Sequence, residues 1–382
     1  MNILTVVETV DIESAGGSAE RARQLALHLK TLGHQSTILT TSVNYSDLTR
    51  STLAELQVIT LRSMFNRFWV PHPRFMIIGK LIKNSDVVHI INHWTILGLL
   101  SYIFCKAYNK PYFISPLGSL IIFGRSKILK RIYNLIIGRK IITNSSGCIV
   151  ATLNEVNNLN DLGIYPEHTF HIPNGVNETK YPVKMSNDYL EALGLHNQYI
   201  VFIGRLNPIK GPDLLLQAFL SIADEIDNLD LVLIGPDEGM AEELKETALI
   251  NGLDSRVHFL GHVYGDNKTM LIQESLFLVV PSRREAMSIV ALEAGILAKP
   301  VLLTDVCGFN EVQDVGGGLV VKPDHESIYH GIKTLINNKE ELGVMGQRLQ
   351  TLVKQNYLWS SAATEHEKIF KSAMSNQELR CE

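Results

Sequence analysis

The chain contains two series in which short apolar runs of strand length alternate with segments whose apolar residues recur at helical spacing. The first series has runs at 3–7, 36–40, 58–61, 87–91, 112–115, 148–151 and 169–172. The second has runs at 199–203, 231–234, 257–260, 276–280, 301–303 and 319–321. Strands that alternate with helices in this way form parallel sheets with helices on both faces. The sequence therefore predicts an α/β fold with two doubly wound, Rossmann-like domains.

The length of the chain agrees with two domains. At 382 residues it exceeds the size at which a single hydrophobic core is usual. We predict a first domain over 1–180 and a second over 198–357, joined by a polar linker. With 19% charged and 46% apolar residues, the composition is that of a soluble globular protein.

Charge is unevenly distributed along the chain. The formal net charge is −4, but residues 1–180 are net basic and the remainder is net acidic. This asymmetry predicts that the first domain meets an anionic partner. The segment 124–140, drawn as a helix, places Ile128, Leu129, Ile132, Leu135 and Ile136 on one side and carries six cations. Such a helix docks on an anionic membrane or buries its apolar side in the core, and the sequence leaves both open.

Neither cysteines nor apolar windows indicate a secreted or membrane-spanning protein. The four cysteines lie far apart without metal-ligand spacing, which fits a reduced cytosol. The chain starts with a predicted strand, and no signal peptide is recognisable. The window 87–105 is about long enough to span a bilayer but contains His89, Asn92 and His93, so we predict a buried strand, a turn and a core helix. The expected location is the cytoplasm.

The segment 275–311 predicts a binding site for a sugar joined to a phosphate. The strand at 276–280 is followed by a short loop and a helix that Ser288 can cap. The helix N-terminus offers a phosphate the amides of Met287, Ser288 and Ile289. Glu285 lies on the loop and Glu293 about two turns inside the helix, where carboxylates can accept hydrogen bonds from sugar hydroxyls. Two unrelated glutamates on an ordinary strand–helix unit explain the pattern equally well.

Two further loops are candidate anion sites. After the strand at 199–203, a basic loop with Arg205 and Lys210 precedes a helix that starts near Pro212. After the first strand, Gly16-Gly17 allows a ligand to approach the backbone closely, although no G-x-G-x-x-G fingerprint is present. Each of these loops is alternatively a simple solvated turn. Ligands of doubly wound sheets bind beyond the carboxyl ends of the strands, which selects the loops at 8–17, 92–95 and 116–119 in the first domain.

The run PSRREAMSIVALEAG resembles the signature of the retaining family 4 glycosyltransferases of GT-B fold, in which seven positions separate two glutamates. The resemblance implies that Glu285 contacts donor-sugar hydroxyls near the reacting carbon and that Glu293 holds the ribose. The family's Gly-Arg, four residues, Lys-Gly pattern is also present, and there Arg205 and Lys210 grip the diphosphate. By the same resemblance, Gly16 and Gly17 close over the donor phosphates.

The resemblance extends to other loops and includes one departure. The loop with Gly261, His262 and Val263 falls where relatives hold the nucleobase. Many relatives have a histidine where this chain has Leu117, and Asn92 or His93 is the candidate substitute. The final helix, 359–382, is expected to return to the first domain.

The function implied is retaining transfer of a sugar from a UDP- or GDP-sugar to a hydroxyl of an acceptor, across a cleft between the two domains. Glu285, Arg205 and Lys210 are the expected catalytic residues, and no Asp-x-Asp pair, metal or other cofactor is expected. The acceptor is expected to be a saccharide linked to a polyprenyl diphosphate in lipopolysaccharide O-antigen, capsule or exopolysaccharide synthesis. The expected acceptor-binding residues are Asn92, His93, Ser119, Arg125 and Lys127.

Two alternatives to a transferase remain open at this point. A sugar-nucleotide epimerase shares the GT-B architecture and needs no acceptor, and a non-catalytic subunit would bind the sugar nucleotide without turnover. Nucleic acid is not an expected partner in either case. For the transferase, the first domain is expected to lie peripherally on the cytoplasmic face of the inner membrane.

Overall fold

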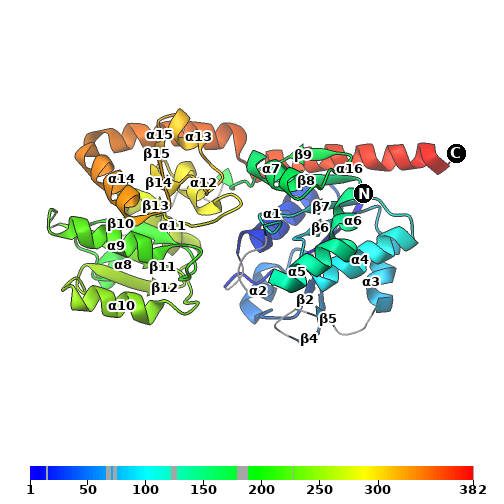
Figure 1. The fold of residues 1–382 in the computed structure, drawn as a ribbon, viewed down its shortest axis with the longest axis horizontal. Coiled ribbons are helices and arrows are strands. Elements are labelled where there is room, and N and C mark those ends of the chain that lie inside the picture. Colours follow the sequence, from blue (N-terminus) through cyan, green and yellow to red (C-terminus); the bar gives the residue numbers. More distant parts are fainter. Residues whose placement is uncertain are drawn as a thin grey trace. The chain divides into compact units, whose positions relative to one another are not determined.

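The computed structural model describes residues 1–13, 16–65, 70–71, 75–121, 127–178, 188–226 and 228–381. Its contacts divide the chain into two compact units. Unit 1 comprises Met1–Gly175 and Trp359–Glu382, and unit 2 comprises Val176–Leu358. Each unit contains a parallel sheet between helices (Figure 1). The predicted fold class of two Rossmann-like α/β domains is therefore confirmed.

Unit 1 is built on a seven-stranded sheet with the order β3-β2-β1-β6-β7-β8-β9. Its strands are β1 (Asn2–Val6), β2 (Gln35–Thr41), β3 (Gln57–Leu61), β6 (Val87–Ile91), β7 (Tyr112–Ser115), β8 (Gly147–Val150) and β9 (Thr169–His171). All neighbouring strands in it are parallel. Each predicted strand of the first series is present. A small antiparallel pair, β4 (Ser63–Phe65) and β5 (Val70–Pro71), was not predicted.

Helices cover both faces of the unit 1 sheet, which is why β6, β7 and β8 are buried along their whole length. The helices are α1 (Gly17–Thr31), α2 (Asp47–Thr52), α3 (Phe75–Asn84), α4 (Ile96–Ala107), α5 (Lys127–Tyr133), the π-helix η1 (Asn134–Gly138), α6 (Arg139–Thr143), α7 (Leu153–Asp161) and α16 (Trp359–Cys381). The apolar window at 87–105 forms β6 and α4, as predicted. Among the described residues, no helix is both long enough and apolar enough to cross a bilayer.

Unit 2 repeats this plan with six parallel strands in the order β12-β11-β10-β13-β14-β15. Its strands are β10 (Gln198–Ile203), β11 (Leu229–Ile234), β12 (Val257–Gly261), β13 (Leu278–Val280), β14 (Val301–Thr304) and β15 (Gly318–Val321). Its helices are α8 (Asp188–Ala192), α9 (Pro212–Ala223), α10 (Ala241–Ile250), α11 (Gly265–Glu274), α12 (Ile289–Ile296), α13 (Glu311–Asp314), α14 (His325–Asn337), η3 (Lys339–Glu341) and α15 (Leu342–Asn356).

Strand order reverses once in each sheet. In unit 1 the chain builds outward from β1 to β3 and then starts again at β6 on the other side of β1. In unit 2 it builds outward from β10 to β12 and starts again at β13 on the other side of β10. At such a reversal the loops leave the sheet in opposite directions, and the crevice between them is the usual ligand site of this fold. The loops after β1, β6, β10 and β13 are therefore the expected positions of ligand-binding residues.

The last helix, α16, belongs to unit 1 and packs against α1. Its residues Trp359, His366 and Phe370 are at most 2% exposed. The rings of His366 and Phe370 contact the ring of His89 on β6, at 5.4 and 5.9 Å between centroids. The prediction that the final helix returns to the first domain is confirmed.

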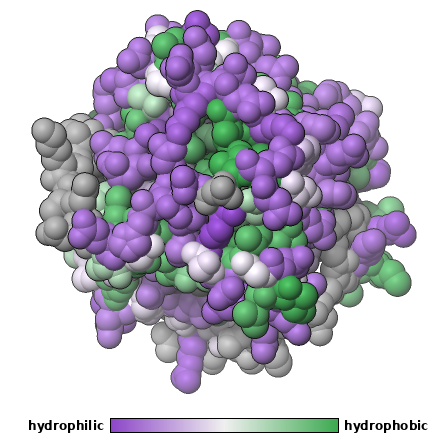
Figure 2. Space-filling model, turned by 90° about the vertical axis from the view of Figure 1, so that its left-hand side faces the viewer, coloured by the Kyte–Doolittle hydropathy of each residue, from purple (hydrophilic) through white to green (hydrophobic). Residues whose placement is uncertain are grey.

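Surface character differs from place to place. Figure 2 shows one face of the structure, on which hydrophilic side chains predominate and hydrophobic ones occupy small areas. Two exposed apolar residues of unit 2 are Leu249 and Ile250 on α10. In unit 1 the apolar residues Ile128, Leu129, Ile132, Leu135 and Ile136 of α5 and η1 are 47–80% exposed. We call these five residues the α5–η1 patch; the core does not cover them.

Candidate active site

The reversal of strand order in unit 2 is bridged by an ion pair between two residues predicted for the site. Lys210 lies on the loop after β10 and Glu285 on the loop after β13. Lys210 Nζ donates to Glu285 Oε1 at 2.7 Å, and Ser282 Oγ donates to Glu285 Oε2 at 3.0 Å. The Lys210 and Glu285 side chains are 22% and 11% exposed, so the pair is partly shielded but reachable. The structure thus brings together two residues that are 75 positions apart in the sequence.

Arg205, the second predicted cation, is paired with a carboxylate that was not predicted for the site. Its Nη1 donates to Glu238 Oε1 at 2.8 Å. Glu238 lies on the loop that follows the neighbouring strand β11. Asn207 Nδ2 donates to the other oxygen of Glu238 at 2.6 Å, and the backbone N–H of Lys210 donates to Asn207 Oδ1. A chain of polar contacts therefore links both predicted cations. The signal for Glu238 was its position directly after a predicted strand at the same edge of the sheet.

The N-terminus of α12 differs in detail from the prediction. Ser288 is the residue that precedes the helix, but its side chain does not cap it. Its N–H donates to the carbonyl of Cys307 at 3.1 Å, so this amide is not available to a phosphate as expected. Its Oγ is fully buried and has no hydrogen-bond partner. Met287 is also buried, whereas Ile289 is half-buried.

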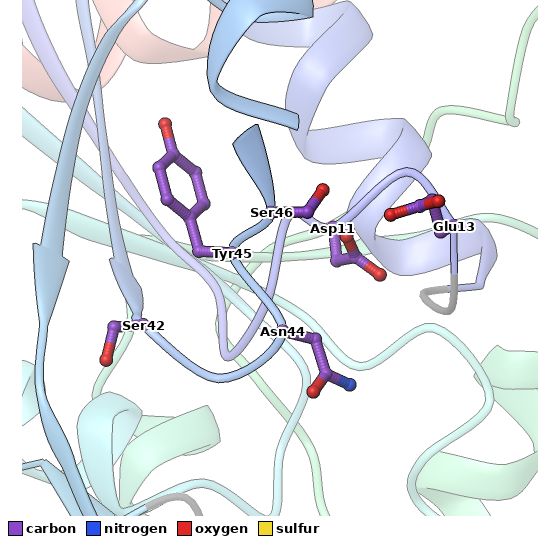
Figure 3. A pocket seen from close by; sticks show the side chains of 6 residues that line it. All are labelled: Asp11, Glu13, Ser42, Asn44, Tyr45 and Ser46. Carbon is purple, nitrogen blue, oxygen red and sulfur yellow. The ribbon is translucent and has the colours of Figure 1, made fainter. Parts of the chain in front are cut away.

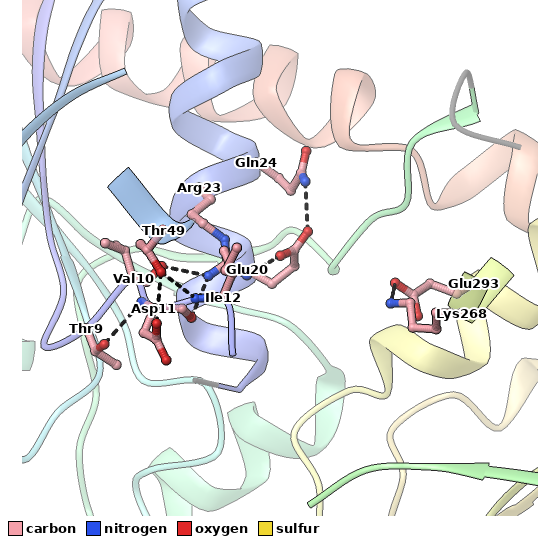
Figure 4. Close-up of polar contacts among 10 residues, drawn as sticks. All are labelled: Thr9, Val10, Asp11, Ile12, Glu20, Arg23, Gln24, Thr49, Lys268 and Glu293. Atoms are coloured by element: carbon pink, nitrogen blue, oxygen red, sulfur yellow. Dashed lines mark hydrogen bonds and ion pairs between the residues drawn. The ribbon is translucent and has the colours of Figure 1, made fainter. Parts of the chain in front are cut away.

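Glu293 lies in α12 and pairs with Lys268 of α11 (Figure 4). It is the fifth residue of the helix, about one turn from its start rather than the two that the sequence suggested. Lys268 Nζ donates to Glu293 Oε1 at 2.7 Å, while Glu293 Oε2 is buried without a partner. Lys268 was not predicted, because nothing in the spacing of the sequence connects it to Glu293. A carboxylate with one committed and one uncommitted oxygen suits recognition of a ligand hydroxyl.

The loop after β12 contains the residues expected near the base. Gly261 has a φ of +64°, a conformation that favours glycine, and its carbonyl accepts from the N–H of Gly235. His262 is exposed and Val263 half-buried. The His262 ring lies 5.8 Å from the exposed ring of Tyr264. These residues form an accessible edge beside β11 and β12.

In unit 1 the reversal of strand order is bridged by Glu8, after β1, and Asn92, after β6. The Nδ2 of Asn92 donates to both carboxylate oxygens of Glu8, at 2.9 and 2.8 Å. Asn92 has a φ of +69°, so its backbone is held in the left-handed region. Burial raises the pKa of the Glu8 carboxyl to about 7, and the hydrogen bond from Asn92 lowers it by less. Asn92 was predicted as a site residue; Glu8 was not, although it also follows a predicted strand.

Other residues predicted to bind the acceptor have different surroundings. His93 is 2% exposed, its Nε2 pairs with Asn134 Oδ1 at 2.8 Å, and burial lowers its pKa to about 4. The N–H of His93 donates to Ser119 Oγ. These contacts describe a buried structural histidine, which an acceptor does not reach in this structure. Lys127 is exposed at the start of α5, and Arg125 lies outside the described residues.

Gly16 and Gly17 are exposed at the start of α1, where the carbonyl of Gly16 accepts from Ala19 and Glu20. The preceding loop is held by Arg23, whose Nη1 donates to the carbonyls of Val10 and Asp11, both at 2.8 Å (Figure 4). Thr49 Oγ1 donates to Asp11 Oδ1 at 2.8 Å. Beside this loop is an open hollow of about 490 Å³, shown in Figure 3. It is lined by Asp11, Glu13, Ser42, Asn44, Tyr45 and Ser46, which include no cation.

No group of three or more histidine, cysteine or carboxylate side chains able to hold a metal occurs in the part of the chain that the structure describes. Cys105, Cys148 and Cys307 are free and buried. Burial raises the pKa of Cys307 to about 12, and nearby Glu285 acts in the same direction. Cys307 is therefore a neutral packing residue behind the loop that holds Glu285.

Two family profiles match the chain. The profile described as Glycosyl transferases group 1 matches residues 191–351, and the profile described as Glycosyltransferase Family 4 matches residues 15–180. The chain belongs to the family 4 glycosyltransferases.

Among curated relatives, the uncharacterized glycosyltransferase MJ1607 of Methanocaldococcus jannaschii is 28% identical over 211 residues, which are 53% of this chain and 54% of that protein. The D-rhamnosyltransferase WbpZ of Pseudomonas aeruginosa is 25% identical over 284 residues, 72% of this chain and 71% of that protein. The match thus spans only about half the length of the first of these relatives.

Among solved structures, Anabaena Alr3699/HepE in complex with UDP and glucose superimposes with a TM-score of 0.81, at 17% identity, over 97% of this chain and 100% of that chain. At this identity the likeness shows the fold alone, which is GT-B. The predicted family and its architecture are therefore confirmed.

Proposed function

We propose that this protein is a retaining glycosyltransferase that moves a sugar from a nucleoside diphosphate sugar to a hydroxyl of a lipid-linked saccharide. The observation that carries the proposal is the Lys210–Glu285 pair, which bridges the strand reversal of unit 2. A cation suits a phosphate and a carboxylate suits sugar hydroxyls, and this pair lies at the position where doubly wound sheets usually bind ligands. The complex of HepE with UDP and glucose supports a donor of this class.

In this proposal Arg205 and Lys210 bind the diphosphate and stabilise the charge that develops on it as the glycosidic bond breaks. Such electrostatic stabilisation is usually the largest contribution to catalysis. Glu293 accepts hydrogen bonds from the ribose, and the residues Gly16, Gly17, His262, Val263, Met287, Ser288 and Ile289 complete the donor site. The backbone contribution of the α12 terminus is smaller than the sequence suggested, because the Ser288 amide is already bonded.

Retention of the anomeric configuration is part of the proposal. Both oxygens of Glu285 are engaged, one by Lys210 and one by Ser282. A carboxylate held in this way is suited to orienting the donor sugar, and less suited to forming a covalent intermediate. We therefore assign Glu285 to donor positioning and the proton acceptor role to the departing diphosphate.

Unit 1 supplies the acceptor side in this proposal. Glu8 and Asn92 offer a half-buried carboxylate and amide at the strand reversal, and the adjacent loops form the hollow of Figure 3. Carboxylates, hydroxyls, an amide and a tyrosine are groups that bind the hydroxyls of a saccharide. Ser119 lies on a neighbouring loop. The described residues that line the hollow include no cation, which disfavours a phosphate there.

The α5–η1 patch supports a membrane-bound acceptor. Its five apolar side chains are exposed, and Lys127, Arg131, Arg139 and Lys140 are exposed on the same helical segment. A helix with exposed apolar and cationic residues binds anionic interfaces, where each cation contributes about 1 kcal/mol. We infer that this segment adsorbs to the cytoplasmic leaflet and brings unit 1 to a polyprenyl diphosphate-linked saccharide, as in surface polysaccharide synthesis.

Vesicle cosedimentation tests the membrane part of the proposal. The parent protein should pellet with phosphatidylglycerol vesicles at low salt, and Leu135→Asp/Ile136→Asp should reduce the pelleted fraction. Leu249→Asp/Ile250→Asp is the matched control, because these α10 residues of unit 2 are similarly exposed. A parent protein that stays in the supernatant would sink the membrane assignment but leave a soluble acceptor open.

Turnover with a panel of UDP- and GDP-sugars, with and without polyprenyl diphosphate-linked saccharides, tests the activity. A transferase releases the nucleoside diphosphate only with acceptor, and NMR of the product gives its anomeric configuration. Conversion of the donor without acceptor would instead identify the epimerase. Donor binding without any turnover would identify a non-catalytic subunit.

A further inference from the structure

The Arg205–Glu238 pair is held by backbone as well as by side chains. The N–H of Leu206 donates to the carbonyl of Pro236 at 2.9 Å, and the N–H of Glu238 donates to the carbonyl of Leu206 at 3.2 Å. These bonds fasten the loop after β10 to the loop after β11. The backbone hydrogen bonds between the two loops therefore hold Glu238 opposite Arg205.

Glu238 is fully engaged but only moderately shielded. One of its oxygens accepts from Arg205 and the other from Asn207. The Arg205 and Glu238 side chains are 36% and 39% exposed. Ion pairs at this degree of exposure are weak and reversible. A diphosphate, which carries more charge and more acceptor oxygens than a carboxylate, can replace Glu238 on the guanidinium.

We propose that Glu238 is a built-in competitor of the diphosphate for Arg205, and that it sets the affinity and the release rate of the nucleoside diphosphate. The inference rests on the proposed function, in which Arg205 binds the donor phosphates. In the empty site Glu238 neutralises Arg205. When the diphosphate binds, Glu238 gives up this contact, and it takes Arg205 back as the diphosphate leaves, which favours release of the nucleoside diphosphate after transfer.

Replacement of Glu238 by glutamine tests this inference, because glutamine keeps the shape of the side chain and removes its charge. Isothermal titration with UDP and with GDP is done on the full chain. For whichever nucleotide the parent binds, Glu238→Gln should lower the Kd about fivefold, mainly through slower dissociation. Glu225→Gln is the control, because Glu225 also forms an exposed ion pair in unit 2, with Lys333, and is 42% exposed. It changes the net charge equally and should leave the Kd unchanged.

A double variant locates the effect on Arg205. In an Arg205→Ala background the additional change Glu238→Gln should lower the Kd less than twofold, because the competition needs the guanidinium. An unchanged or higher Kd for Glu238→Gln alone would overturn the inference, and so would an equal gain in the Arg205→Ala background. A parent protein that binds neither UDP nor GDP would instead overturn the proposed function, so the two failures are distinguishable.

Discussion

The two units place different chemistry at the same topological position. In unit 2 the strand reversal is bridged by a cation and a carboxylate, Lys210 and Glu285. In unit 1 it is bridged by an amide and a carboxylate, Asn92 and Glu8. The pair in unit 2 therefore contains a positive charge, which suits a phosphate, and the pair in unit 1 contains an amide and a carboxylate, which suit hydroxyls. A common fold determines where each site lies, and the residues on the loops determine what it can bind.

The comparison also separates exposed charge from buried charge. The ion pairs of the unit 2 site remain reachable, with side chains 11–39% exposed. Unit 1 instead buries Arg21, His89 and His366 in its interior. The charged residues named at its candidate site are the carboxylates Glu8, Asp11 and Glu13. Variants in unit 2 should therefore affect ligand binding and turnover, whereas several in unit 1 should affect stability.

The sharpest way to separate the two sites is Glu285→Gln. Transfer should fall by more than roughly a hundredfold, because the donor sugar loses its charged positioning group. Nucleoside diphosphate affinity should stay within about threefold, since Lys210 remains. Steady-state turnover and titration calorimetry measure the two effects. Equal loss of nucleotide affinity, or retained turnover, would remove Glu285 from the sugar site.

Lowering the pH should reduce the stability of unit 1 through its buried histidines. Burial, with Arg21 adding to it, lowers the pKa of His366 to about 3. The unfolded chain therefore takes up a proton below pH 6.5 that the folded chain refuses, and stability is lost as the pH falls through this value. From pH 7 to pH 5 the loss due to His366 should be about 2 kcal/mol.

Burial raises the pKa of Glu8 and Glu155, so these two groups stabilise the fold as the pH falls and partly offset the loss due to His366. The contribution of His366 is therefore isolated by comparing the parent protein with His366→Gln. Denaturant unfolding followed by tryptophan fluorescence is suitable, since all three tryptophans belong to unit 1. The variant should lose less stability than the parent between pH 7 and pH 5. Equal losses in both proteins would show that His366 is not the responsible group.

Glu8→Gln tests whether the unit 1 site binds the acceptor. Glutamine is neutral, so the hydrogen bonds that an acceptor hydroxyl would donate to residue 8 are weaker than those to the glutamate. The KM of the acceptor should therefore rise about tenfold. The KM of the donor should not change. In the parent, acceptor binding should improve as the pH rises through about 7, where the Glu8 carboxyl ionises. Glu167→Gln, at an exposed carboxylate of unit 1, is the control.

The smallest expected effect is that of a chelator. Arg205 and Lys210 can neutralise a diphosphate without a divalent ion, so transfer in EDTA should stay within about twofold of its value in buffer. Initial rates before and after chelation provide the measurement. Full dependence on added magnesium or manganese would show that the unit 2 cations are insufficient.

Nearly all of the sheet architecture was predictable from the sequence. Every strand of the two large sheets coincides with a predicted apolar run to within two residues at either end. Strands buried on both faces give uninterrupted apolar runs, and this signal is strong. The pair β4 and β5 was missed, because Ser63–Phe65 and Val70–Pro71 are too short to show a pattern.

The partners of the site residues were much less predictable. Arg205, Lys210, Glu285 and Glu293 were predicted as site residues from spacing and resemblance. Their partners Glu238 and Lys268 come from other loops and helices, 33 positions from Arg205 and 25 from Glu293. Such pairs depend on which strands are neighbours, and a linear pattern does not contain this information. The same reason explains His93, which looked like a loop residue in the sequence but is enclosed by Asn134 of η1.

The return of α16 to unit 1 has a consequence for the order in which the chain can fold during synthesis. The ribosome releases residues 176–358, all of unit 2, before Trp359, His366 and Phe370 emerge. Domains generally fold as units as the chain appears. Unit 2 can therefore fold before unit 1 is complete. During this time the surface of α1 that α16 later covers is exposed. Unit 1 gains the contacts between α1 and α16 only after α16 has been synthesised.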